Sequence, residues 1–136
     1  MRFLCDVSPI PIALDEELIG KFTPESKAET LDSIKPAYIV IKPSLEGGFS
    51  GAGEWIRLAD ERNIGWWITS SLESNIGLNA LSQWVATLNQ KRPQGLGTGA
   101  LFTNNIPSPI YTDGEKLKYN PDVTLDRDVI DKLDWR

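Results

Sequence analysis

The sequence predicts an α/β fold in which four parallel strands alternate with helices. Short apolar segments recur at intervals of roughly 27 to 30 residues, which indicates a repeated structural unit. Three of the four segments are continuous apolar runs, as is typical of strands buried on both faces of a parallel sheet. Amphipathic stretches fill the intervals between them, so the order along the chain is that of a βαβ series.

The predicted strands are short, and the last one differs from the others in being rich in glycine. Trp66 and Trp67 are neighbours in the third strand, and we interpret both as core residues with one ring on each face. The strands span residues 9–14 (PIPIAL), 37–41 (AYIVI), 65–69 (GWWIT) and 95–102 (GLGTGALF).

Helices are predicted in the three intervals, over residues 23–35, 51–63 and 77–90, where apolar residues recur on one helical face. Thr23 is a suitable N-cap for the first of them, and Pro24 suits its first position. After residue 110 the sequence becomes polar and rich in aspartate. We therefore expect a tail with one short helix over residues 126–133.

Composition excludes several classes of protein. The chain has 136 residues, a net charge of -5 and a pI of about 4.7, which argues against a surface that binds nucleic acid phosphates. No apolar run approaches the roughly 20 residues of a membrane span, and Asp6 interrupts the apolar start that a signal peptide needs. The single cysteine, Cys5, excludes an internal disulfide and fits a reducing compartment. We expect a cytoplasmic protein.

The absence of histidine excludes further kinds of catalytic and metal site. Ser-His and Cys-His triads are excluded, as are metal sites with histidine ligands. Proton transfer would therefore use Lys, Asp, Glu, Tyr or the lone Cys.

Polar or backbone-donating groups follow each of the four predicted strands. The carboxyl ends of parallel strands meet at one edge, and βα folds carry their sites there. The candidate site residues are Asp15, Lys42, Ser70, Ser71, Gly97, Thr98 and Gly99.

Each candidate also has a purely structural interpretation. Asp15 offers the hard oxygen that Mg²⁺ prefers, or it belongs to a solvated acidic loop with Glu16 and Glu17. Lys42 can serve as a base if it points into a shared mouth, or it lies along the surface at a strand end.

The serine and glycine candidates are ambiguous in the same way. Ser70 and Ser71 can bind a substrate carboxylate or cap the strand end, and without histidine they are poor nucleophiles. The backbone N–H groups of residues 97–99 can approach an anion, or the glycines allow a tight turn.

Four stretches of the chain resemble the C-terminal half of the o-succinylbenzoate synthases, a family of the enolase superfamily. The segments LDE and IKP are shared widely in the superfamily, whereas SSLESNIG and PQGLGTG are more specific. The resemblance runs over residues 8–110 and is carried by PIALDEEL, YIVIKPSLEGG, WWITSSLESNIGLNALSQWVATL and PQGLGTGALFTNNI.

The resemblance implies a partial TIM-type (β/α) barrel over residues 1–110, followed by the polar tail over residues 111–136. The complete fold of the family is a modified eight-fold barrel with an α+β capping domain. The family reaction implied is the Mg²⁺-dependent dehydration of 2-succinyl-6-hydroxy-2,4-cyclohexadiene-1-carboxylate to o-succinylbenzoate in menaquinone biosynthesis, which makes the protein a carbon-oxygen lyase. Lysine and Mg²⁺ chemistry agrees with the lack of histidine.

The resemblance also implies roles for the candidate residues. Asp15, with Glu16 beside it, matches the last of three carboxylates that hold one Mg²⁺. Lys42 matches the lysine of the sixth barrel strand, which supports the anionic intermediate electrostatically. Ser70, Ser71 and the backbone at residues 97–99 would bind the succinyl carboxylate and ring side of the substrate.

The sequence departs from the family in extent. The second-strand lysine motif, the first two metal carboxylates and the cap have no counterpart, and Lys116-Leu117-Lys118 in the tail does not match the motif. A complete barrel needs roughly 250 residues. We therefore expect a fragment, a split gene product or a mis-started gene. Such a chain would be inactive without a complementary N-terminal half, and would associate with that half or with itself.

Two alternatives remain open. One is an N-acylamino acid racemase or dipeptide epimerase of the same superfamily, which is disfavoured because epimerases place Asp-x-Asp where this chain has Gly97-Thr98-Gly99. The other is a non-catalytic fragment that acts as an interaction module.

Overall fold

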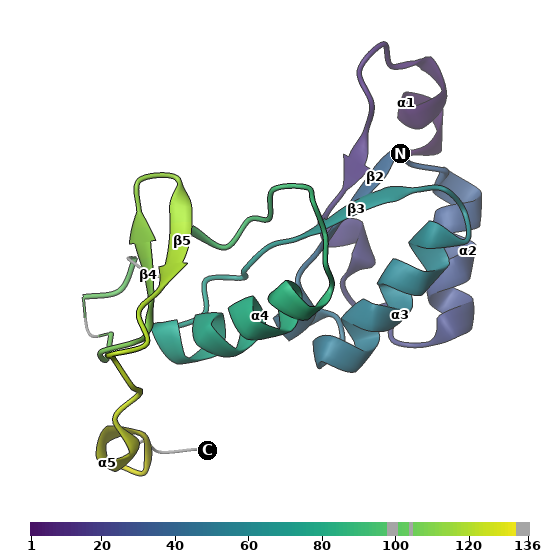
Figure 1. Ribbon diagram of the computed structural model, residues 1–136. Helices are drawn as coiled ribbons and strands as arrows, with labels where there is room; N and C mark the ends of the chain where they lie inside the picture. The colour runs from purple at the N-terminus through teal and green to yellow at the C-terminus, as the bar shows by residue number, and fades with distance from the viewer. Residues whose placement is uncertain (98–100, 104, 133–136) are drawn as a thin grey trace. The chain divides into compact units, whose positions relative to one another are not determined.

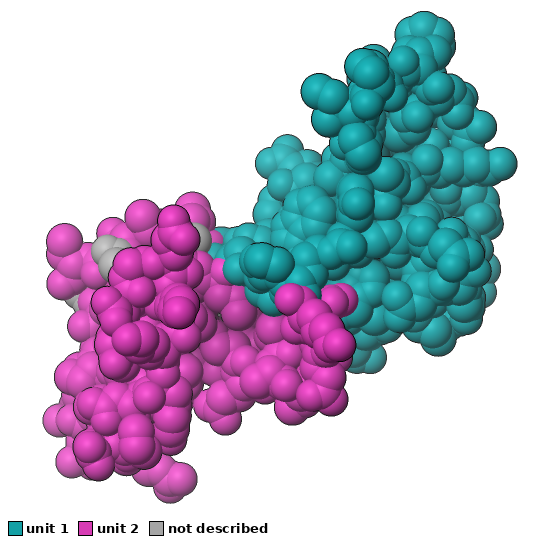
Figure 2. Space-filling view, turned by 45° about the horizontal axis from the view of Figure 1, so that its top comes forward, with its two compact units in different colours: residues 1–71, 92–95 teal, residues 72–91, 96–136 magenta. Residues whose placement is uncertain are grey.

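The computed structural model describes residues 1–97, 101–103 and 105–132, and these form two compact units (Figure 2). The first unit comprises residues 1–71 and 92–95, and the second comprises residues 72–91 and 96–136. The expected division into a barrel segment and a polar tail at residue 110 stays a prediction, and each compact unit is described by itself. None of the described helices has the length and apolar character that a membrane crossing requires.

The first unit is built on a parallel sheet in the order β1-β2-β3, which confirms the predicted α/β class (Figure 1). In the register of the sheet, Leu14 lies opposite Ile39, and Ile41 lies opposite Ile68. All four of these side chains are fully buried, as the continuous apolar runs predict. The strands are β1 (Ala13–Leu14), β2 (Tyr38–Ile41) and β3 (Gly65–Ile68).

The predicted fourth strand is not confirmed among the described residues. In its place Gly95 forms a single parallel bridge with Thr69. The N–H of Gly95 donates to the carbonyl of Ile68 at 2.8 Å, and its own carbonyl accepts from the N–H of Ser70 at 3.0 Å. A Cβ atom at Gly95 would lie 2.6 Å from Thr69 Oγ1, so the close approach requires glycine. Residues 98–100 of the predicted strand lie outside the described residues.

Two of the predicted helices flank the strands of the first unit, as α2 (Pro24–Ile34) and α3 (Gly48–Asp60). The side chain of Thr23 accepts a hydrogen bond from the N–H of Ser26 at 3.2 Å, which confirms the predicted cap. The structure adds a short N-terminal helix that the sequence analysis missed, α1 (Arg2–Val7), and two short turns of 3-10 helix, η1 (Glu16–Leu18) and η2 (Pro43–Leu45).

A buried lysine joins α2 to α3. The side chain of Lys27 is 1% exposed, and its ammonium donates to Glu54 Oε2 at 2.7 Å and to the carbonyl of Gly51 at 3.0 Å. It also lies 5.6 Å from the ring centroid of Trp55, the largest fully buried side chain in the described chain. The paired and bonded charge explains how a lysine is tolerated in this position.

The two tryptophans of β3 differ in burial. Trp66 is buried, and its Nε1 donates to Asp60 Oδ1 at 2.9 Å. Trp67 is only half-buried and packs against Tyr38 with ring centroids 6.0 Å apart. The prediction of a core residue is therefore confirmed for Trp66, while Trp67 lies at the edge of the core.

Two glycines of α3 provide a matched test of how closely this helix packs against the preceding turn. A Cβ atom at Gly51 would lie 2.0 Å from the backbone carbonyl of Glu46, whereas one at Gly53 would meet nothing within 4 Å. We expect Gly51→Ala to lower the free energy of unfolding by about 1–3 kcal/mol, as overpacking does. Gly53→Ala should raise it by about 0.5–1 kcal/mol, because alanine favours the helix. Urea unfolding of both variants measures this, and equal effects would contradict the packing described.

The second unit contains the third predicted helix, α4 (Asn75–Thr87), and a hairpin of β4 (Ile110–Asp113) and β5 (Lys116–Tyr119). The hairpin was missed because its strands are exposed and polar; Gly114 makes its turn with φ +59°. The predicted tail helix is present but shorter, as α5 (Arg127–Ile130), and Asp126 Oδ1 caps it by accepting from the N–H of Asp128 at 2.9 Å.

Candidate functional site

The carboxyl ends of the three parallel strands lie at one edge of the sheet in the first unit. Asp15 directly follows β1, and Lys42 directly follows β2. Ser70 and Ser71 come shortly after β3. Four of the predicted site residues therefore lie beyond the same edge, because parallel strands end on the same side.

Asp15 and Lys42 form an ion pair at this edge. The ammonium nitrogen of Lys42 lies 2.5 Å from Asp15 Oδ1. The Lys42 side chain is 17% exposed and that of Asp15 is 47% exposed, so the pair lies at the surface with the lysine largely covered. The expected proximity of these two side chains at the ends of neighbouring strands is confirmed, and their roles in a shared mouth stay a prediction.

The carboxylate of Asp15 has capacity for a further ligand. Its Oδ1 atom is buried and paired with the ammonium of Lys42, but a carboxylate has two oxygens and about four lone-pair positions, so one cation does not exhaust it. A carboxylate oxygen of this kind is a hard ligand that suits Mg²⁺. The described residues hold no cluster of three His, Cys, Asp or Glu side chains that could bind a metal. Asp15 therefore fits one ligand position of a metal site.

Glu46 is a buried carboxyl group next to this pair, and the sequence analysis missed it. It follows η2 and is 0% exposed. Its Oε1 accepts a hydrogen bond from the backbone N–H of Lys42 at 3.0 Å, and its Oε2 is buried with no hydrogen-bond partner among residues 1–97, 101–103 and 105–132. Burial raises the pKa of Glu46 to about 7, although the hydrogen bond and the charge of Lys42 act in the opposite direction.

This pKa predicts a pH dependence of stability. An unfolded glutamate titrates near 4.5, so between pH 4.5 and about 7 the folded state binds more protons than the unfolded state. As the pH rises from 4.5 to about 7, the titration of Glu46 should therefore lower the free energy of unfolding by about 3 kcal/mol. Below pH 4.5 this loss of stability does not occur.

The matched variant for this prediction is Glu46→Gln, which does not titrate. Urea unfolding of both proteins at pH 4 and pH 8, with a chelator present, isolates the contribution of the carboxyl group. We expect the variant to gain stability relative to the wild type at pH 8 only. A difference between the two proteins that is the same at both pH values would contradict the prediction.

The serine candidates are placed beyond β3, but their predicted role stays a prediction. Ser70 is buried, and its backbone N–H is bonded to Gly95. Ser71 is half-buried. Leu72, which follows, has a left-handed backbone with φ +68°, so the chain turns sharply directly after the two serines.

The remaining candidates belong to other parts of the chain, and their predicted roles stay predictions. Gly97 is exposed and lies in the second unit, with open space where a side chain would stand. Thr98 and Gly99 lie outside the described residues. Glu16 is exposed, as the solvated-loop interpretation predicts, and Glu17 is half-buried.

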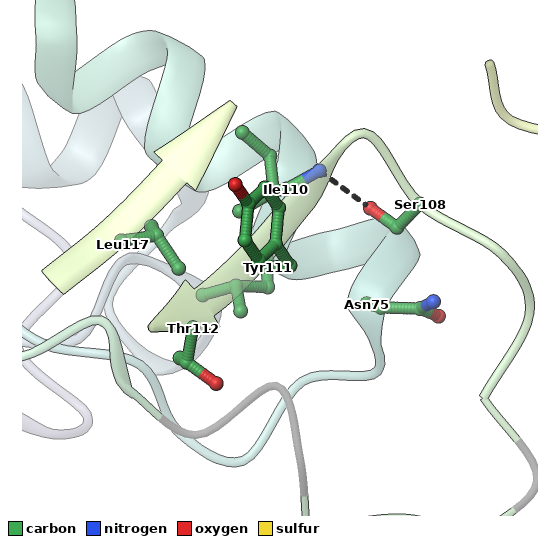
Figure 3. Close-up of a pocket in the computed structure, with 7 residues that line it drawn as sticks. Asn75, Ser108, Ile110, Tyr111, Thr112 and Leu117 are labelled. Atoms are coloured by element: carbon green, nitrogen blue, oxygen red, sulfur yellow. Dashed lines mark hydrogen bonds between the residues drawn. The ribbon is translucent and has the colours of Figure 1, made fainter. Parts of the chain in front are cut away.

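The second unit contains a pocket of about 260 Å³ between α4 and the hairpin (Figure 3). Ser108 closes one side of it, and its Oγ accepts a hydrogen bond from the N–H of Ile110 at 3.2 Å. No predicted site residue is among its lining residues, which are Asn75, Leu78, Ser108, Ile110, Tyr111, Thr112 and Leu117.

Comparisons with known proteins identify relatives of the chain. It is 59% identical over 117 residues to an o-succinylbenzoate synthase of Desulfotalea psychrophila, covering 86% of this chain and 32% of the relative. It is 36% identical over 62 residues to an o-succinylbenzoate synthase of Edwardsiella ictaluri, covering 46% of this chain and 19% of the relative. No protein-family model matches the chain.

Solved structures give the same result. The crystal structure of MenC from Desulfotalea psychrophila superposes with a TM-score of 0.81 at 57% identity, covering 86% of this chain and 33% of that one. Muconate cycloisomerase from Pseudomonas fluorescens superposes with a TM-score of 0.77 at 22% identity, covering 99% of this chain and 38% of that one. The second match shows a shared fold alone.

The chain therefore has the α/β fold of these solved structures, which belong to the enolase superfamily. Within this superfamily, the chain is a homologue of the o-succinylbenzoate synthases, which confirms the resemblance described above. The chain spans about a third of the length of the Desulfotalea relative that it matches.

Proposed function

We propose that this chain supplies one part of the active site of an o-succinylbenzoate synthase. The reaction is the Mg²⁺-dependent loss of water from 2-succinyl-6-hydroxy-2,4-cyclohexadiene-1-carboxylate, which gives o-succinylbenzoate for menaquinone biosynthesis in the cytoplasm. The observation that carries the proposal is the ion pair of Asp15 and Lys42 beyond the carboxyl ends of neighbouring parallel strands. Sequence identity of 59% to a curated o-succinylbenzoate synthase supports the choice of reaction.

Each residue has a distinct role in this proposal. Asp15 would be one of the carboxylates that hold Mg²⁺, since a carboxylate offers the hard oxygens that this cation prefers. Bound Mg²⁺ would neutralise negative charge that develops on the substrate carboxylate when the neighbouring proton is removed. Lys42 keeps its ammonium beside Asp15 and faces the same developing charge, so it stabilises the anion electrostatically.

The substrate contacts of the proposal lie at Ser70, Ser71 and residues 97–99. A hydroxyl group and backbone N–H groups are donors, and a succinyl carboxylate needs donors. Ser70 is held in place by the bridge to Gly95, which supports a role in orientation rather than in bond making.

The proposal requires further catalytic residues in addition to those of this chain. The other metal carboxylates and the lysine base would come from barrel strands outside this sequence, in the same polypeptide or another. The exposure of apolar side chains in the first unit supports this, because Phe3 is 72% exposed and Ile10 is 71% exposed. No described strand pairs with the free edge of β1, which is a second surface available for pairing.

A complementation assay tests the proposal. The full chain is mixed with the region of the Desulfotalea enzyme that lies outside the matched segment, and dehydration is followed with and without Mg²⁺. We expect Mg²⁺-dependent activity only in the mixture. A chimera, in which this chain replaces the matched segment of that enzyme, separates failure of assembly from failure of chemistry.

The outcomes discriminate among the candidate functions. Inactivity of a folded chimera that still binds Mg²⁺ would overturn the synthase proposal. Racemisation of an N-acylamino acid or epimerisation of a dipeptide, without dehydration, would favour the other superfamily activities. A stable complex without any of these activities would favour an interaction module.

A further inference from the structure

Glu46 is fully buried although its side chain is ionisable, and this burial calls for a physical explanation. A carboxyl group removed from water without full compensation costs free energy. Oε1 of Glu46 accepts one hydrogen bond, whereas Oε2 has no hydrogen-bond partner in the part of the chain that the structure describes. A hydrophobic side chain of similar size would fill the same space without that cost. The group is therefore a candidate for a role other than packing.

The hydrogen bond that the Glu46 carboxyl group accepts comes from Lys42, one of the two residues of the ion pair. Oε1 accepts from the backbone N–H of Lys42, four positions earlier in the chain. Between the two residues the η2 turn closes on itself, with Leu45 N–H donating to the Lys42 carbonyl at 2.9 Å and Glu46 N–H donating to the Pro43 carbonyl at 3.3 Å. Lys42 is thus held at both its N–H and its carbonyl.

The backbone of Glu46 is restrained by the residues that follow it at the start of α3. Gly47 and Gly48 follow it with left-handed backbones, at φ +94° and +69°, and lead into α3. Gly51 lies so close that an added Cβ would meet the Glu46 carbonyl, and the buried ammonium of Lys27 donates to the carbonyl of Gly51. The first turn of α3 therefore leaves Glu46 little freedom to move.

We propose that Glu46 is a positioning residue for Lys42. Its Oε1, held by the first turn of α3, fixes the backbone of Lys42 so that the ammonium group is directed to Asp15. Its consequence for catalysis rests on the proposed function, in which Lys42 and Asp15 act together on one substrate. The positioning itself is a property of this chain and is measurable without activity.

The test compares Glu46→Met with Glu46→Gln in the full chain. Both substitutions remove the negative charge and nearly keep the volume, but only glutamine keeps an oxygen that can accept from the Lys42 N–H. The readout is the rate at which an acylating reagent modifies Lys42, measured by mass spectrometry against the exposed Lys116 of the second unit. Circular dichroism verifies that each variant is folded.

We expect Glu46→Met to raise the relative labelling rate of Lys42 roughly two- to fivefold, the effect of losing a partly exposed ion pair. Glu46→Gln should stay near the wild type. In an Asp15→Asn background, where the pair is already broken, Glu46→Met should have no further effect.

Every other outcome overturns the proposal. If both variants accelerate labelling equally, charge and not position is responsible. If neither does, Lys42 is directed without Glu46. If the methionine variant does not fold while the glutamine variant does, Glu46 is a folding residue. Because labelling needs no second half of the barrel, an inactive complementation assay leaves this test unaffected.

Discussion

Replacing Asp15 by asparagine should lower the dehydration rate of the completed barrel by at least about 10³-fold. The substitution keeps the shape of the side chain and removes the charge that a hard cation needs. Loss of the metal removes several kcal/mol of stabilisation of the developing charge, which corresponds to this factor. The measurement is the turnover of the chimera or of the mixed halves at saturating Mg²⁺.

The control for this prediction is Glu17→Gln, which neutralises a half-buried carboxylate two positions further along the chain. Its turnover should stay within about threefold of the wild type, because Glu17 has no part in the proposed site and substitutions away from special features have small effects. Turnover of the Asp15→Asn enzyme within tenfold of the wild type would reject the metal role, and equal losses in both variants would indicate a general effect of charge.

Replacing Lys42 by alanine should lower turnover by about 10²- to 10³-fold, the effect of removing one group that stabilises an oxyanion. Unlike Asp15→Asn, this variant should still bind Mg²⁺, because Lys42 contributes no ligand atom. Turnover and Mg²⁺ affinity are therefore measured on the same preparation, since a group that acts only in the transition state lowers the rate without weakening binding.

The matched control is Lys21→Ala, which removes a half-buried lysine of the same unit that is not in the ion pair. It should leave both quantities near the wild type. If Lys42→Ala weakens Mg²⁺ binding as much as it slows turnover, the lysine is a structural residue of the site, and its electrostatic role is wrong.

The parallel sheet and its helices could be predicted from the sequence because local signals repeat. Thr23 and Pro24 start a helix by chemistry that acts within one turn. The run Ile39-Val40-Ile41 is apolar without alternation, as a doubly covered strand requires. The meeting of Asp15 and Lys42 then followed from topology, because parallel neighbours end on the same side.

Other features depend on contacts between segments, so the sequence alone did not reveal them. Nothing local marks Glu46 as buried, because its burial depends on the packing of α3 against the η2 turn. The glycines of residues 95–102 carry no side chain to show a buried face, so a bridge at Gly95 was predicted as a strand. The hairpin after residue 109 is exposed and polar, and its burial pattern resembles that of a loop.

In the proposed site, Asp15 binds the metal, and Lys42 lies beside Asp15 without binding the metal. Calorimetric titration of Mg²⁺ into the completed barrel tests this most directly, with the wild type, Asp15→Asn and Lys42→Ala compared under the same conditions. We expect Asp15→Asn to weaken Mg²⁺ binding at least about tenfold, because a charged oxygen ligand is lost, and Lys42→Ala to change it by less than about threefold, because the lysine supplies no ligand atom. Unchanged Mg²⁺ affinity in a folded Asp15→Asn protein would contradict it.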